Sequence, residues 1–191
     1  MTVQQTRRVR CRHASAADQP ALATMLTDPA ALGALPDAAG ASGTAAAPPA
    51  VWQQTAAIRV IESVATGSVI GACRLYDVDP RAGIGWFDVH GVAEHQGGGR
   101  IAEGCLCHLE WAFAQWDLRW LYAHVLEPNW PAFASIVRHL APEVHLGILR
   151  ERVIHAGAPC DVHVLGISRE VWLASPARRR LMRRLDDPGP A

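Results

Sequence analysis

The chain has 191 residues, half of them hydrophobic, a length and composition that fit one globular domain and argue against global disorder. Its 18 basic residues are all arginines and balance 18 acidic residues, so a broad nucleic-acid-binding surface is not indicated and a lysine nucleophile is excluded. No signal peptide or membrane-spanning run is visible, and five scattered cysteines predict reduced, buried thiols in a cytoplasmic protein: Cys11, Cys73, Cys105, Cys107 and Cys160.

The N-terminal segment, residues 6–13, alternates in the manner of a strand, with Val9 and Cys11 on one face and arginines on the other. A capped helix should follow and end before Pro29. Residues 30–50 are rich in Ala, Gly and Pro and can contribute little to a core. We expect this segment to be either a lid-like loop within the domain or a plain disordered insertion.

Two β-rich runs, residues 58–64 and 68–76, flank a Thr-Gly pair, which indicates a hairpin. A third run, residues 83–92, follows a turn that contains Asp77 and Asp79. Two carboxylates are too few to hold a metal ion, so we predict solvated turn residues and no metal site here.

Three glycines, Gly97 to Gly99, lie between this third run and a helical pattern from Arg100 to about Asp117. A strand, a glycine loop and a helix N-terminus together present free backbone N–H groups and the positive end of the helix dipole. The arrangement favours a loop that cradles a phosphate group, although a flexible turn has the same composition. The Walker pattern is absent, and the dinucleotide-binding fingerprint fits poorly.

The helix after the loop carries a hydrophobic face at helical spacing, typical of a core stripe: Ile101, Cys105, Leu109, Ala112 and Trp116. Cys105 and Cys107 diverge on a helix because they are two residues apart, and no second Cys/His pair supplies further ligands. The sequence therefore predicts no zinc site.

A strand over residues 119–126 and a helix over residues 130–140 follow, and Pro131 lies in the first turn of that helix. The last segment, residues 176–191, carries five arginines. We expect it to be a solvated terminal helix, with binding to an acidic ribosome or RNA surface as the alternative. The chain thus divides into a single domain over residues 1–175 and an Arg-rich tail.

The run from Gln96 to Ile101 resembles the acyl-CoA loop of the GNAT acyltransferases, Q/R-x-x-G-x-G/A, and Glu103 resembles a glutamate of their ribosomal-protein N-terminal acetyltransferase branch. Other motifs of that branch follow in order over residues 6–173. They resemble an opening T-x-R-L-x-L-R, a turn L-Y-D-x-D, an Asn after a strand (Asn129), and a closing hairpin L-R-x-x-V and D-V-x-x-Y.

This resemblance implies an α+β fold: a mixed, mostly antiparallel sheet, splayed near its middle, with helices on both faces. It also implies acetyl-CoA, or another acyl-CoA, as cofactor, and the residues that would bind it are Val89, Gly91, Gln96, Gly97, Gly98, Gly99, Arg100, Ile101, Ala102 and Asn129. The loop departs from the family pattern at Ile101, where Gly or Ala is usual. Its bulk would either crowd the pyrophosphate or leave the role of the small residue to Ala102.

Acyl transfer from a thioester to an amine needs a neutral amine and a stabilised oxyanion, and the leaving thiolate takes up a proton. Four side chains near the splayed strand are candidates for the base: Asp88, His90, Glu94 and His124. His90 is favoured because an unperturbed imidazole has a pKa of about 6.5. The tyrosine acid of many family members would fall at Ile136, which leaves Ser135 as the nearest hydroxyl, or solvent, as the acid. The predicted catalytic residues are thus His90, Asp88 and Ser135.

The main hypothesis is an acyl-CoA-dependent N-acetyltransferase that acetylates a primary amine, on a small molecule or a protein N-terminus, by direct attack in a ternary complex. One alternative is a non-catalytic acyl-CoA-binding or regulatory domain, suggested by Ile101 and Ile136. The other is a nucleotide-phosphate-binding enzyme that uses the same loop. We expect no membrane or nucleic-acid partner, and a homodimer is compatible with the sequence.

Overall fold

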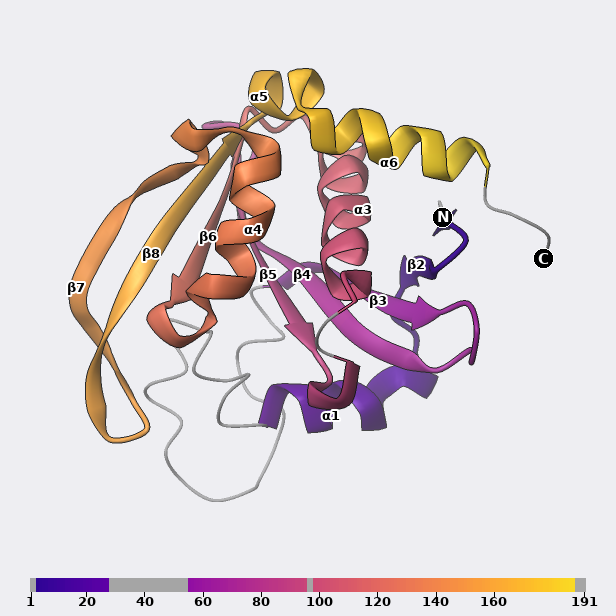
Figure 1. Cartoon of the computed structure of the whole chain (residues 1–191), viewed down its shortest axis with the longest axis horizontal. Coiled ribbons are helices and arrows are strands. Elements are labelled where there is room, and N and C mark those ends of the chain that lie inside the picture. Colours follow the sequence, from indigo (N-terminus) through magenta and orange to yellow (C-terminus); the bar gives the residue numbers. More distant parts are fainter. Residues whose placement is uncertain (1–2, 28–54, 96–97, 188–191) are drawn as a thin grey trace.

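The computed structural model describes residues 3–27, 55–95 and 98–187 (Figure 1). Eight strands of the described residues form one sheet: β1 Gln4–Gln5, β2 Val9–His13, β3 Thr55–Ser63, β4 Val69–Asp79, β5 Ile84–Gly91, β6 Trp120–Leu126, β7 His145–His155 and β8 Ala158–Ser168. The α-helices of these residues are α1 Gln19–Thr27, α3 Arg100–Gln115, α4 Trp130–Leu140, α5 Arg169–Ala174 and α6 Pro176–Asp186. None of these helices is long and apolar enough to cross a lipid bilayer.

The sheet has the order β1-β2-β3-β4-β5-β6-β8-β7, and all neighbouring strands are antiparallel except β5 and β6. β5 and β6, both fully described, pair in parallel only over residues 84–86 and 120–122. Figure 1 shows them diverging toward their C-terminal ends. The predicted fold, a mixed and mostly antiparallel sheet with a splay near its middle, is confirmed.

Adjacent residues of β3 show that helices cover both faces of the sheet. Val60 packs with Leu22 and Met25 of α1. Ile61 points to the opposite face, where a Cβ added to Gly104 of α3 would lie 2.4 Å from Ile61 Cδ1. Only glycine at this position lets α3 approach the sheet so closely.

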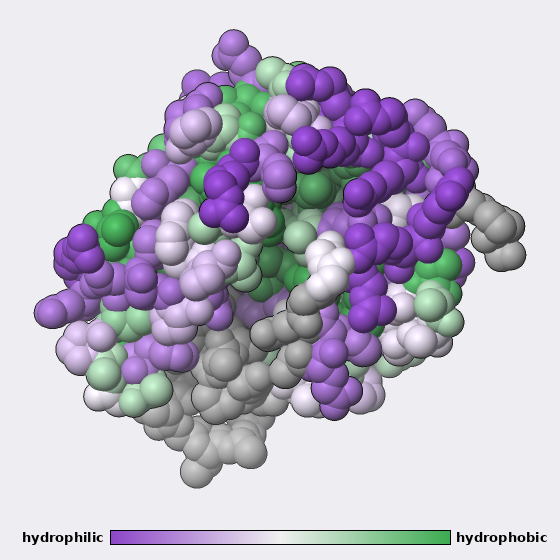
Figure 2. All heavy atoms as spheres, viewed as in Figure 1, coloured by the Kyte–Doolittle hydropathy of each residue, from purple (hydrophilic) through white to green (hydrophobic). Residues whose placement is uncertain are grey.

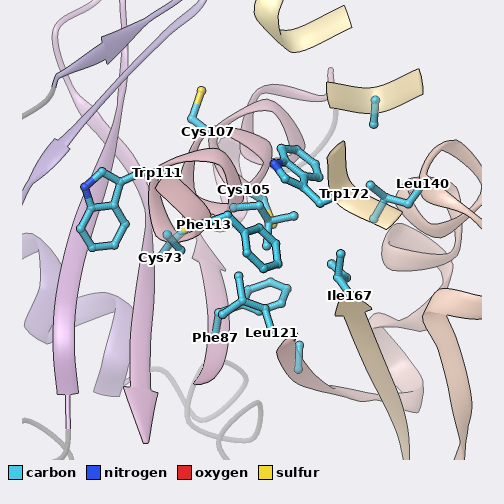
Figure 3. Close-up of a cluster of buried hydrophobic side chains, with 14 of the residues drawn as sticks. Cys73, Phe87, Cys105, Cys107, Trp111, Phe113, Leu121, Leu140, Ile167 and Trp172 are labelled. Atoms are coloured by element: carbon cyan, nitrogen blue, oxygen red, sulfur yellow. The ribbon is translucent and has the colours of Figure 1, made fainter. Parts of the chain in front are cut away.

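The larger core lies between α3, the middle strands and α5 (Figure 3). The hydrophobic stripe predicted on α3 is confirmed, with three of its residues buried and two half-buried: Cys105, Leu109, Ala112, Ile101 and Trp116. Trp172 of α5 is fully buried here, and its indole N–H donates a 2.8 Å hydrogen bond to Glu110 of α3. A hydrogen-bonded indole can be buried without leaving an unpaired donor.

The arginine-rich C-terminal segment forms α6, and the inner face of this helix is buried rather than solvated. Leu181 of α6 is buried. Two ion pairs join the helix to α3: Arg178 lies 2.7 Å from Glu110, and Arg184 lies 2.5 Å from Glu103. The expectation of a solvated terminal helix fails on this face because apolar packing and charge pairing both hold α6 against α3.

The hairpin predicted at Thr66-Gly67 is confirmed. Gly67 has a φ of 68°, in the left-handed region that favours glycine, and its N–H donates a 2.8 Å hydrogen bond to the Ser63 carbonyl. The loop predicted over residues 30–50 lies outside the described residues.

A buried histidine, His108 of α3, makes the stability of this fold depend on pH. The residue is 1% exposed, and neither ring nitrogen has a hydrogen-bond partner among the described residues. Burial, with the nearby charge of Arg59, lowers the pKa of His108 from 6.5 to about 3. The unfolded chain therefore binds a proton below pH 6.5 that the folded chain does not.

Stability from neutral His108 is therefore complete above pH 6.5 and is lost as the pH falls toward 3. We predict that the free energy of unfolding falls by up to about 1.4 kcal/mol per pH unit from pH 6.5 down to about 4.5, before the carboxylates titrate. The variant His108→Leu should lose clearly less over the same range, measured by urea denaturation. Equal losses in both proteins would contradict the assignment.

Candidate active site

The glycine loop enters α3 with the geometry that an anion site requires. Gly98 and Gly99 have φ values of 61° and 74°, which favour glycine. Gly99 is the N-cap residue of α3, and no side chain caps the helix. The first intrahelical bond runs from the Glu103 N–H to the Gly99 carbonyl at 3.0 Å, so the N–H groups of residues 100–102 have no intrahelical partner. These donors suit a phosphate group.

The loop is held by side chains at some distance in the sequence. Arg8 Nη2 donates to the Gly98 carbonyl, and Arg8 Nη1 lies 3.5 Å from Glu103 Oε2. Glu103, only 2% exposed, also pairs with Arg184 of α6. The glutamate noted from the family pattern is therefore a buried anchor, whereas the sequence analysis did not single out Arg8. Gln96 and Gly97 lie outside the described residues.

Ile101, the departure from the family loop, packs against two glycines of the sheet. A Cβ added to Gly71 of β4 would lie 2.9 Å from Ile101 Cδ1, and one added to Gly91 of β5 would lie 3.1 Å from Ile101 Cγ1. The side chain thus points into the interface between α3 and the sheet, where the two glycines make room for it. Its bulk is directed to the sheet rather than to the helix N-terminus.

The predicted cofactor residues outside the loop lie beside the opening between β5 and β6. Val89 and Gly91 follow the last pair that β5 makes with β6, and on their other edge they pair with β4. Asn129 lies three residues after the end of β6, in the short 3-10 helix Glu127–Asn129; it is exposed and makes no side-chain cap at the start of α4. Figure 2 shows this face of the molecule hollowed between α3 and α4, with hydrophobic residues at the base of the hollow.

A buried charged cluster, formed by Arg74 of β4 with Asp88 and His90 of β5, lies on the opposite face of the sheet. Arg74 Nη2 lies 2.6 Å from Asp88 Oδ2, and His90 Nε2 lies 3.2 Å from Asp88 Oδ1. Phe87, the residue before Asp88, belongs to the core under α3, and Ala72, the neighbour of His90 on β4, packs with α1. Because side chains alternate along a strand, Asp88 and His90 face the α1 layer.

The charges of this cluster set the roles that its members can take. Burial raises the pKa of Asp88, but His90 and Arg74 outweigh it and hold that pKa below its usual value. Asp88 is therefore ionised and a poor base. His90 Nε2 faces the Asp88 carboxylate at 3.2 Å, and we assign the proton of a neutral ring to this nitrogen, which leaves the lone pair on Nδ1.

The structure thus brings His90 and Asp88 together and adds Arg74, which the sequence analysis did not single out. Arg74 stands directly opposite Asp88 in the β4–β5 pairing, so the register of the predicted strands carried the signal.

Two further candidates for proton transfer, Ser135 and Glu94, lie apart from this cluster. Ser135 is exposed on α4, and Glu94 is exposed after β5. Within the described residues no hydrogen bond or ion pair joins either side chain to Asp88 or His90. The His124 ring of β6 lies 4.6 Å from the ring of Trp86 on β5.

The cysteines of the core face one another in two pairs. Cys105 contacts Cys73 of β4, and Cys107 contacts Cys11 of β2, so the two helix positions diverge as predicted. Burial raises the pKa of the Cys73 thiol, and the contact with Cys11 together with burial raises that of Cys107, so both remain protonated. Cys160 is half-buried rather than buried, since it lies near the tip of the β7–β8 hairpin. No set of three or more His, Cys, Asp or Glu side chains in the described part of the chain is placed to hold a metal ion.

A family model described as "Acetyltransferase (GNAT) domain" matches residues 8–138, well over half of the chain. The chain therefore belongs to the GNAT family, and it is a GNAT-family acetyltransferase. Members of this family use acetyl-CoA, which sets aside a nucleotide-phosphate-binding enzyme. None of the curated proteins matches the chain.

Solved structures share the fold at low sequence identity. A spermidine N-acetyltransferase from Vibrio cholerae, solved with CoA and spermine, matches with a TM-score of 0.70 and 18% identity over 87% of this chain and 98% of its own. A ribosomal-protein-S5-alanine acetyltransferase from Vibrio fischeri matches with a TM-score of 0.67 and 14% identity over 90% and 99%. A GNAT-family acetyltransferase from Bacillus anthracis matches with a TM-score of 0.66 and 13% identity over 88% and 99%.

We predict that Gly99→Asp abolishes the thermal stabilisation that CoA confers, because a carboxylate at the N-cap would occupy the place of a phosphate and repel it. Gly67→Asp is the matched control. Both glycines have positive φ (74° and 68°), and a Cβ at either meets nothing within 4 Å. Both variants should lose similar intrinsic stability, and only Gly99→Asp should lose the CoA-dependent shift in Tm. A full CoA shift in folded Gly99→Asp would place CoA elsewhere.

Proposed function

We propose that this protein transfers the acetyl group of acetyl-CoA to a primary amine, on a small molecule or a protein N-terminus, by direct attack in a ternary complex. The observation that carries the proposal is the position of Asp88 and His90. They lie on β5 beside the opening of the sheet, on the face opposite the helix α3 that the glycine loop begins. An acetyl donor and an amine acceptor would therefore meet at this opening from opposite faces.

The donor side fits an acyl-CoA. Residues 100–102 offer backbone N–H groups at a helix N-terminus without a side-chain cap, and a Cβ on Gly99 would meet no described residue beyond its chain neighbours and its own helix within 4 Å. We assign acyl-CoA binding to the loop from Gln96 to Ala102, to Val89 and Gly91 on the open part of β5, and to Asn129. When bound, acetyl-CoA supplies the acetyl group as an activated thioester.

The acceptor side supplies proton transfer. His90 Nδ1 takes the proton that the amine loses, and the Asp88 carboxylate, 3.2 Å from Nε2, stabilises the protonated ring. Arg74 fixes Asp88 from its other oxygen at 2.6 Å and keeps it ionised. Since Ser135 is exposed and joined to no member of the cluster, we assign protonation of the leaving thiolate to solvent.

The acceptor class rests on the nature of the structural neighbours. Their names give spermidine and a ribosomal-protein alanine as the groups that they acetylate, and both present an amine. Glu103 and the motifs of the ribosomal-protein branch favour a protein N-terminus, whereas the structural match with the highest TM-score of these three favours a polyamine. A panel that contains peptides with different N-terminal residues and linear polyamines separates the two.

We predict that His90→Gln lowers kcat by about 10² to 10⁴, the usual contribution of a general base, and removes the acidic limb of the kcat–pH profile. His124→Gln is the control, since His124 also lies near the opening but contacts Trp86. The His124→Gln variant should keep the acidic limb of the kcat–pH profile. Loss of the limb in His124→Gln but not in His90→Gln would show that the base is His124.

We also predict that Asp88→Asn retains part of the activity and moves the acidic limb to lower pH. The variant keeps the size of the side chain but removes the negative charge that stabilises the protonated His90 ring. The KM for acetyl-CoA should change little, because Asp88 lies on the acceptor face. A raised KM for acetyl-CoA with an unmoved limb would contradict this role.

A further inference from the structure

Five arginines converge on a hollow of about 550 Å³ between the N-terminal segment, the first turn of α3 and helix α6. We call this hollow the arginine groove; its lining residues are Arg7, Arg8, Glu103, Arg180, Arg183, Arg184 and Asp187. Figure 2 shows strongly hydrophilic residues gathered over α6 and the neighbouring N-terminal segment. Two walls of the groove therefore present guanidinium groups to the same space.

The carboxylates of the groove pair with only some of these arginines. Glu103 pairs with Arg8 and Arg184, and Asp187 pairs with Arg7 at 2.5 Å. Within the described residues no carboxylate lies in ion-pair range of Arg180 or Arg183. Five positive charges thus face two negative ones, in a chain whose net charge is zero. A bound anion would offset their mutual repulsion.

The chemistry of the lining favours phosphate. Planar guanidinium groups form paired hydrogen bonds with phosphate oxygens, and several that converge suit a ligand with more than one phosphate. The volume is that of a small-molecule site. No aromatic side chain is among the described lining residues, although single-stranded nucleic acids are usually bound by stacking on such rings.

The groove is connected to the glycine loop through Arg8, which both lines the groove and donates to the Gly98 carbonyl. A polyanion in the groove would compete for this guanidinium. It would also place negative charge beside Arg8 and Glu103, both of which contact the loop or its helix. Both effects oppose the binding of a second anion at the loop.

We propose that the arginine groove binds a polyphosphate, meaning a small ligand with two or more linked phosphate groups, and that its binding weakens the binding of acyl-CoA. The second part rests on the proposed function, because it assumes that acyl-CoA occupies the glycine loop. The site thereby acts as an inhibitory anion site distinct from the acetyl-transfer site.

Calorimetric titration with inorganic tripolyphosphate tests the site. Arg183→Gln should weaken binding by about tenfold, since one charged hydrogen-bonding group is lost. The double variant Arg180→Gln/Arg183→Gln should weaken it further, while CoA binding persists. Arg179→Gln is the matched control, because it removes the same charge from the same helix, but Arg179 does not line the groove. It should change the affinity by less than about twofold.

Gly99→Asp separates this proposal from the proposed function, since it should lose CoA binding and keep tripolyphosphate binding. Loss of tripolyphosphate binding in Gly99→Asp, with full binding in the double variant, would place the anion at the glycine loop and overturn the proposal. The proposal is also overturned if tripolyphosphate does not bind the unmodified protein. It is overturned as well if an RNA oligonucleotide or a polyglutamate peptide binds more tightly than tripolyphosphate in a way that depends on Arg183. Titration with ATP shows whether the linked phosphates of the ligand belong to a nucleotide or to a free polyphosphate. If ATP binds more tightly than tripolyphosphate, the ligand is a nucleotide; if ATP binds equally or more weakly, it is a free polyphosphate.

The coupling is measured by titrating CoA with and without saturating tripolyphosphate. We expect the Kd for CoA to rise by at least about fivefold, the lower end of typical allosteric coupling. The same rise should be absent in the double variant. An unchanged Kd in the unmodified protein would refute the inhibitory role.

Discussion

A single buried carboxylate, Glu103 in the first turn of α3, connects the parts of this protein that hold the glycine loop. It pairs with Arg184 of the C-terminal helix and with Arg8 of the N-terminal segment, and Arg8 in turn holds the carbonyl of Gly98. A charge that is 2% exposed is costly unless it is paired, and the two arginines supply that pairing. The positive end of the helix dipole favours the carboxylate at this place. The direction in which the glycine loop presents its N–H groups therefore depends on both ends of the chain.

The splay between β5 and β6 opens the sheet, and we propose that acetyl transfer takes place at this opening. The two strands pair over three residues each and then separate, so that β5 presents one face to α3 and the other to the α1 layer. Phe87 and Ile101 fill the first face, and the ionised pair of Arg74 and Asp88 lies on the second. The alternation of side chains along one strand thus separates the apolar packing on the α3 face from the charged cluster on the α1 face, where we propose that proton transfer takes place.

Much of this arrangement was predictable from the sequence. The order of elements, the glycine loop, the stripe on α3 and the hairpin at Gly67 follow from periodicity and turn chemistry, which act over a few residues. The sequence analysis placed Asp88 and His90 near the splayed strand without pairing them, although residues two apart on a strand share a face.

Other contacts were not predictable in this way. The bonds from Arg8 to Gly98 and from Arg184 to Glu103 join residues at least 81 positions apart, and nothing in a local pattern specifies them. The burial of α6 was missed for the same reason, since the six residues of this helix that are not arginine reveal an inner face only when α3 is in place. The direction of the Ile101 side chain was not predictable either. The two glycines that make room for it lie on different strands, so the sequence around the loop did not show that its bulk points to the sheet rather than to the helix N-terminus.

The central claim is direct transfer of acetyl from acetyl-CoA to an amine at the splay. Initial rates of thiol release, measured while acetyl-CoA and the best amine of the panel are both varied, test it most directly. The account predicts amine-dependent release with intersecting double-reciprocal lines, and one N-acetylated product for each thiol. Parallel lines together with an acetylated form of the protein would contradict direct transfer, and thiol release that does not depend on the amine would contradict acetyl transfer itself.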